Sequence, residues 1–121
     1  MKNFLQVFTL VLCGFAGTTL ADDFRSIVIA GGVTQALPRV HGDQFMVIRN
    51  FTQENGITHG VVTVTMLPGT TAVNVLAAAI LTMSPPDVIN SVVIAGPADV
   101  SVSCGATSGM NCFISFKKDS N

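Results

Sequence analysis

The sequence of 121 residues contains no tryptophan and no tyrosine, so phenylalanine is its only aromatic residue. Charged residues make up only 11% of the chain, whereas a soluble domain usually has about a quarter. A surface with so few charges repels other copies of itself weakly. The composition therefore favours a protein that packs against a partner, and the missing Trp and Tyr weaken the case for a carbohydrate-binding module.

Basic clusters are also missing, since the six Lys and Arg residues are scattered along the chain. Nucleic-acid binding needs a concentrated positive surface, so nucleic acid is not expected as a partner. The one long apolar run, Phe4 to Phe15, is shorter than the roughly 20 residues that a transmembrane helix requires.

That run follows Lys2 and precedes small residues that end at Ala21, a pattern typical of a secretory signal peptide. We expect residues 1–21 to be removed and residues 22–121 to form one domain with no membrane span. A retained N-terminal anchor is the alternative. The leader has bacterial character and predicts a secreted or periplasmic protein. Removal of residues 1–21, which include Lys2, would leave a chain with five basic and seven acidic residues and a net charge of −2.

Two of the three cysteines, Cys104 and Cys112, remain after removal of the leader that contains Cys13. An even number of cysteines in an exported chain indicates a disulfide. Such a short closed loop would stabilise the fold by roughly 2–3 kcal/mol through chain entropy.

The segments on either side of this pair, Ala98–Cys104 and Cys112–Lys118, both alternate apolar and polar residues. If the cysteines face each other, Val102 lies opposite Ile114, and Asp99 lies opposite Lys117. Apolar pairs on one face and an opposite-charge pair on the other are typical of an antiparallel ladder. The pattern therefore predicts a disulfide-clamped terminal hairpin.

A three-stranded meander is predicted in the middle of the chain, with turns at Glu54–Gly56 and Pro68–Gly69. These turns place Met46 and Ile48 opposite Val64 and Val62 on the next strand, and Val64 and Val62 opposite Val73 and Val75 on the third. All six side chains would then share one face.

The opposite face of the same meander is less polar than a solvated sheet face should be. It is predicted to carry Phe45, Val47, Phe51 and Val61. We interpret these four residues as a possible interface, covered by a second copy or by another exported protein.

Turn signals every 8 to 12 residues indicate seven or eight short strands in an all-β fold, a small antiparallel β-sandwich of jelly-roll-like type. The segment Ala77–Met83 is compatible with either a helical turn or a strand.

Residues for chemistry are few. His41 and His59 are the only histidines, and a metal site would need distant carboxylates to join them. No Gly-x-Ser-x-Gly motif or phosphate-binding loop is present. We therefore expect no enzyme activity, no catalytic or metal-binding residues and no cofactor.

Three functions follow, in order of preference. The first is an exported, non-enzymatic structural or interaction module that associates with itself. The second is a small-ligand or carbohydrate-binding module that uses the loop ends, where Met110 and Asn111 could contact a ligand. The third is a metal-dependent enzyme that uses the two histidines.

Overall fold

The computed structural model describes residues 23–85, 87–106 and 109–120, so the predicted signal peptide lies outside the described residues. Within them the chain forms nine strands and no helix, which confirms the all-β prediction. The strands are β1 (Arg25–Ala30), β2 (Thr34–Ala36), β3 (Gln44–Gln53), β4 (Val61–Met66), β5 (Ala72–Ala77), β6 (Ala79–Ile80), β7 (Val92–Ala95), β8 (Ala98–Ser103) and β9 (Asn111–Ser120).

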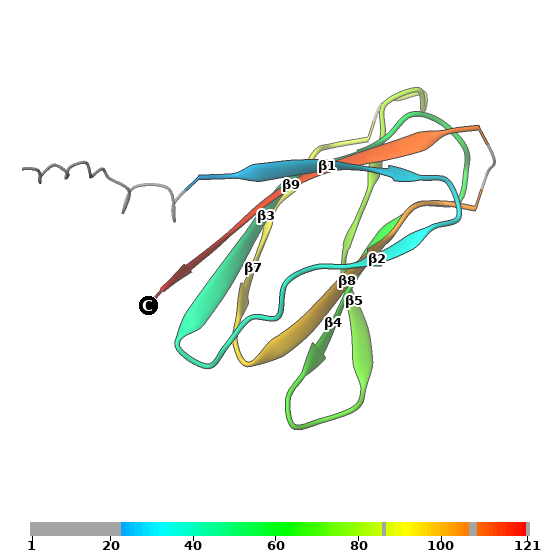
Figure 1. Ribbon diagram of the computed structural model, residues 1–121. Coiled ribbons are helices and arrows are strands. Elements are labelled where there is room, and N and C mark those ends of the chain that lie inside the picture. The colour runs from blue at the N-terminus through cyan, green and yellow to red at the C-terminus, as the bar shows by residue number, and fades with distance from the viewer. Residues whose placement is uncertain (1–22, 86, 107–108, 121) are drawn as a thin grey trace, which may run out of the picture.

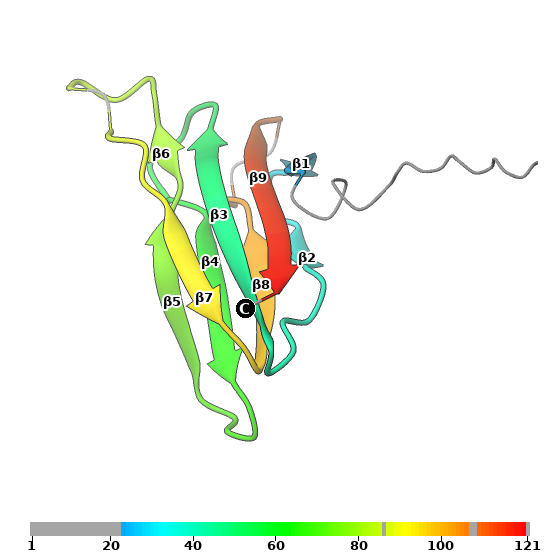
Figure 2. The same cartoon turned by 90° about the vertical axis from the view of Figure 1, so that its left-hand side faces the viewer.

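The strands form two sheets, which Figures 1 and 2 show from two sides. The first has the order β1-β9-β3-β6, with β7 also paired to β3, and the second has the order β2-β8-β4-β5. Pairing is antiparallel except between β3 and β6, which run parallel. The predicted antiparallel arrangement therefore holds for every pair but this one.

Both sheets contribute alternate side chains to one buried core, as expected for strands with a period of two. The members of this core are buried aliphatic, methionine and phenylalanine side chains. They include Ile29, Met46, Ile48, Phe51 and Ile114 from the first sheet and Val62, Val64, Val100 and Val102 from the second.

The predicted terminal hairpin is wrong, because β8 and β9 belong to different sheets. Val102 of β8 lies opposite Val62 of β4, and Ile114 of β9 lies opposite Ile27 of β1. Val102 and Ile114 do share the same core, but across the two layers. The alternation correctly identified the inward face of each strand and did not identify its partner.

The predicted meander is wrong in its first half for the same reason. Met46 and Ile48 of β3 pair with β7 and β9, while Val62 and Val64 of β4 lie in the other sheet. The second half is confirmed at one pair, Val64 opposite Val73.

Beyond that pair a register shift places Leu76, rather than Val75, opposite Val62. The segment Ala77–Met83, left open by the sequence, contains the end of β5 and the short strand β6. The chain passes from the second sheet to the first at Ala78, which is buried.

Candidate functional site

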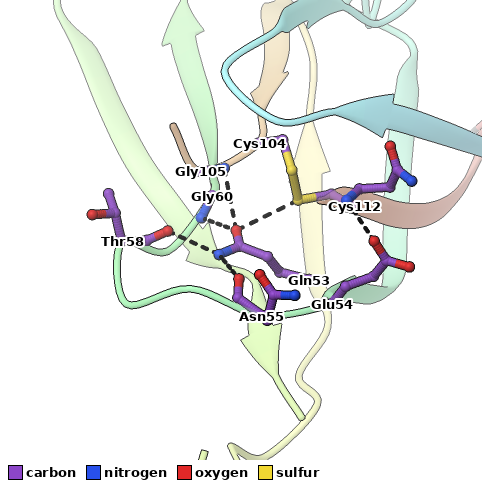
Figure 3. Close-up of a disulfide and its surroundings, with 9 residues drawn as sticks. Gln53, Glu54, Asn55, Thr58, Gly60, Cys104, Gly105 and Cys112 are labelled. Carbon is purple, nitrogen blue, oxygen red and sulfur yellow. Dashed lines mark hydrogen bonds between the residues drawn. A yellow bond between two sulfur atoms is a disulfide. The ribbon is translucent and has the colours of Figure 1, made fainter. Parts of the chain in front are cut away.

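Cys104 and Cys112 form the predicted disulfide, with their Cα atoms 5.7 Å apart. The bond joins the end of β8 in one sheet to the start of β9 in the other (Figure 3). Cys104 is 5% exposed and Cys112 is 1% exposed, so neither sulfur is presented to solvent as a reactive group. The disulfide is a structural link between the layers and is compatible with an oxidising compartment.

Gln53 lies beside this disulfide and is only 1% exposed (Figure 3). Its amide nitrogen donates to the carbonyls of Asn55 and Thr58, at 3.0 and 2.9 Å. Its amide oxygen accepts from the N–H groups of Gly60 and Gly105, at 2.8 and 3.2 Å. The side chain therefore bonds four main-chain groups, of which the N–H groups of Gly60 and Gly105 are buried, and holds the β3–β4 loop against the end of β8.

The four residues predicted to form an interface do not share one surface. Phe45 and Val47 lie half-buried on the outer face of β3, whereas Phe51 is 1% exposed in the core. Val61 is half-buried on β4, in the other sheet. The prediction that Phe51 and Val61 share one face with Phe45 is therefore wrong.

The inward position of Phe51 has a local cause. The register between β3 and β9 shifts between Arg49 and Thr52, and Asn50 has a φ of 56°. An extra residue in a strand turns the following side chains to the opposite face, so Phe51 and Gln53 point inward. Asparagine is among the few residues that adopt this left-handed conformation readily.

The two residues predicted to contact a ligand, Met110 and Asn111, differ in exposure. Met110 is 1% exposed in the core, so its side chain is not at the surface. Asn111 is exposed, and its N–H donates to the Glu54 carboxylate at 2.8 Å. Asn111 lines a surface hollow of about 580 Å³ together with Val28, Phe113 and Leu81. Thr107 and Ser108 of this loop lie outside the described residues.

The two histidines lie near opposite ends of β3, since His41 precedes the strand and His59 is in the loop pinned by Gln53 at its far end. A strand of this length spans about 30 Å, so the pair cannot share a metal ion. No group of three or more potential metal ligands occurs among the residues that the structure describes. These positions give no support to the hypothesis of a metal-dependent enzyme that uses the two histidines.

His59 instead contacts Asp87, with 2.8 Å between its Nε2 atom and a carboxylate oxygen. The same oxygen accepts a hydrogen bond from the Ile80 N–H at 3.0 Å. The Ile80 amide, followed by the His59 ring, lowers the pKa of the Asp87 carboxyl below its ordinary value. This pair ties the segment after β6 to the loop before β4.

The most distinctive surface is an open edge between β5 and β7, which lie along the same side of the molecule (Figure 2). Val73 and Val75 of β5 face the space between the sheets but remain 55% and 37% exposed. On β7, Val92 is half-buried and Ile94 is 5% exposed. The sheets leave a groove of about 290 Å³ here, with an almost entirely apolar lining.

The apolar character continues around β7 onto the outer face of the first sheet. Val93, which is 64% exposed, lies opposite Val47, and Ala95 lies opposite Phe45. We call the combined area the edge surface. It consists of Phe45, Val47, Val73, Val75, Val93 and Ala95.

Sequence reasoning found Phe45 and Val47 but missed the β5 and β7 members of the edge surface. A signal for them was present: Ala72–Ala77 and Val92–Ala95 contain no charge and no proline. Edge strands usually carry charges, prolines or other protection against pairing. The absence of these features in two strands could have indicated an unprotected edge.

Comparisons of the chain with family models, with curated proteins and with solved structures found no match. A search of the described residues for a helix long and apolar enough to cross a membrane also found none.

Proposed function

We propose that this chain is an exported, non-enzymatic interaction module that associates with itself through the edge surface. The observation that carries the proposal is the exposure of inward-facing side chains. Val73 and Val75 are directed toward the core, yet the opposite sheet does not cover them. Covering such a continuous apolar area is the main favourable contribution to protein association.

The strand order supports placing the fold among the jelly-roll sandwiches. Consecutive strands alternate between the sheets, except that β4 and β5 both lie in the second sheet and β6 and β7 both lie in the first. Orders of β1-β9-β3 and β2-β8-β4-β5 in the two sheets are compatible with the double Greek key of that class. Because this fold class serves many functions, the proposal rests on the edge surface and not on the class.

Export is the second part of the proposal. The leader pattern at residues 1–21 and the buried disulfide both support a secreted or periplasmic location. Expression in a bacterial host should yield a cell-envelope or secreted protein whose N-terminal residue is Asp22. Material retained in the cytoplasm with residues 1–21 attached would contradict this part.

Association is tested by light scattering of the purified mature chain during size-exclusion chromatography. We expect a mass that is a multiple of the monomer mass and that depends on concentration. Val73→Lys should lower the associated fraction, because it places a charge on the groove wall. Val28→Lys is the matched control, since Val28 is also exposed on an edge strand but lies on β1. A wild-type chain that stays monomeric at all concentrations would refute self-association.

A second candidate is small-ligand binding in the hollow beside Asn111. Its volume of about 580 Å³ is within the range of ligand sites, and it combines an exposed Phe113 with the Glu54 carboxylate. Thermal-shift screening of glycans and small amphiphiles tests this candidate. A hit should be lost in Phe113→Ala and retained in Val73→Lys.

A further inference from the structure

The main chain of β7 has hydrogen-bonding groups that point away from its only partner. Among the described residues, β7 pairs with β3 alone. The Gly96 N–H, one residue beyond the strand, donates to the Gln44 carbonyl at 3.0 Å. The register that sets Phe45 opposite Ala95 also sets Gln44 opposite Gly96, so these two form a hydrogen-bonded pair.

Hydrogen-bonded and non-hydrogen-bonded pairs alternate along an antiparallel ladder. Ile94 and Val92 therefore also direct their N–H and C=O groups toward β3. Val93 and Ala95 direct theirs outward, away from the sheet. The edge of β7 thus presents an ordered row of donors and acceptors beside an apolar groove.

We propose that two copies of this chain associate by antiparallel pairing of β7 with β7 across a two-fold axis that passes at Val93. This inference rests on the proposed function and specifies the geometry of self-association. In this register the N–H of each Val93 donates to the C=O of Val93 in the second copy. The flanking pairs join Ser91 of one copy to Ala95 of the other.

The side chains of β7 are self-complementary in the same register. Val92 lies opposite Ile94 of the second copy, and all four of these side chains point toward the space between the sheets. On the outer face the two exposed Val93 side chains meet each other. The added strand extends the first sheet over β5, where Val73 and Val75 are uncovered.

The charge distribution favours a second copy over a charged partner. A two-fold interface brings each residue near its own copy, so a charge close to the axis would repel itself. Neither β5 nor β7 contains a charged residue. The groove lining is also free of charged residues, so no group there selects a partner of opposite charge.

The first experiment is cysteine cross-linking of the mature chain. Val93→Cys should form an intermolecular disulfide under mild oxidation, because a hydrogen-bonded pair has Cα atoms about 5.5 Å apart. Val28→Cys, at a similarly exposed site on β1, should not cross-link. Peptide mapping should find the Cys104–Cys112 bond intact in both variants.

The second experiment uses charge swaps at the axis. Val93→Lys and Val93→Glu should each weaken dimer formation by about tenfold or more, since like charges meet. An equimolar mixture of the two should form heterodimers, because opposite charges then meet at the same position. Restoration by mixing is expected only if residue 93 lies next to its own copy.

The outcomes separate the two proposals. A wild-type dimer in which Val93→Cys does not cross-link and the charge variants show no rescue would overturn β7 pairing and leave self-association standing. A wild-type monomer would overturn both. Circular dichroism of each variant identifies any that fails to fold, and the remaining variant then decides the question.

Discussion

Val64 and Val73 lie directly opposite each other on β4 and β5 and face the same interior, yet Val64 is 5% exposed and Val73 is 55% exposed. The difference arises because β5 is the last strand of its sheet, and the opposite sheet ends at β7 without covering it. The core is therefore closed around Val64 and open at Val73.

Hydrogen exchange should report this open edge directly. In dilute solution the amide of Val93, which points away from β3, should exchange faster than that of Ile94, which points toward β3. At concentrations where the chain associates, protection should increase at Val93 and stay unchanged at Ile94. Equal protection of the two amides in dilute solution would contradict the hydrogen-bond pattern assigned to β7.

Removing the disulfide should lower the stability of the domain without changing its fold. The bond closes a loop with a sequence separation of 8. Chain entropy then predicts that the double variant Cys104→Ala/Cys112→Ala loses about 2–3 kcal/mol in the free energy of unfolding, measured with urea. Val33→Ala, at an exposed apolar site, is a control that should change the free energy by less than about 0.5 kcal/mol.

Replacing Gln53 should strongly lower the free energy of unfolding, because this one side chain bonds several main-chain groups. Gln53→Met keeps the approximate volume but leaves the N–H groups of Gly60 and Gly105 without their acceptor. Buried unpaired groups cost about 1–3 kcal/mol each, so a loss of about 2–4 kcal/mol is expected in urea unfolding. Gln35→Met on β2, where the side chain is exposed, should be nearly neutral. Similar losses for both variants would argue against the role assigned to Gln53.

The bulge in β3 predicts opposite responses to two substitutions at Asn50. Glycine adopts a positive φ without strain, so Asn50→Gly should leave the free energy of unfolding within about 1 kcal/mol of wild type. Asn50→Val should cost about 1–2 kcal/mol or more, because a β-branched residue is unfavourable in the left-handed region. Thermal unfolding of the two variants compares them. A tolerated valine would mean that the strand lacks the bulge.

The His59–Asp87 contact predicts a pH-dependent contribution to stability. A carboxyl whose pKa is lower in the folded state stabilises the fold above its unfolded pKa, about 3.9. That contribution decreases as the pH falls toward and through the lower folded pKa of Asp87. Asp87→Asn should therefore lose less stability than the wild type between about pH 5 and pH 2. Urea unfolding across this range provides the measurement.

The sequence predicted the local properties of the strands better than their partners. Alternation placed Met46, Ile48, Val62, Val64 and Ile114 in the core, and all five are buried. It could not place them in sheets, because a period of two is the same whether the facing residue lies on a neighbouring strand or across the core. Turn chemistry identified the β4–β5 connection, where consecutive strands do pair.

The predicted site was partly correct for a similar reason. Phe45 and Val47 lie on the outer face as expected, but Phe51 follows a bulge that no simple alternation reveals. Val73 was assigned to the third strand of the meander without notice that this strand ends its sheet. Edge position depends on the whole topology, which local patterns do not specify.

The position of β9 has a consequence for how the chain is made. This strand, residues 111–120, lies between β1 and β3 and supplies the hydrogen-bonding partner of both. Until those residues have left the ribosome, β1 and β3 therefore lack the strand that joins them in the first sheet. Pairing between strands so far apart in the sequence forms late, so the first sheet is completed only after residues 111–120 have emerged.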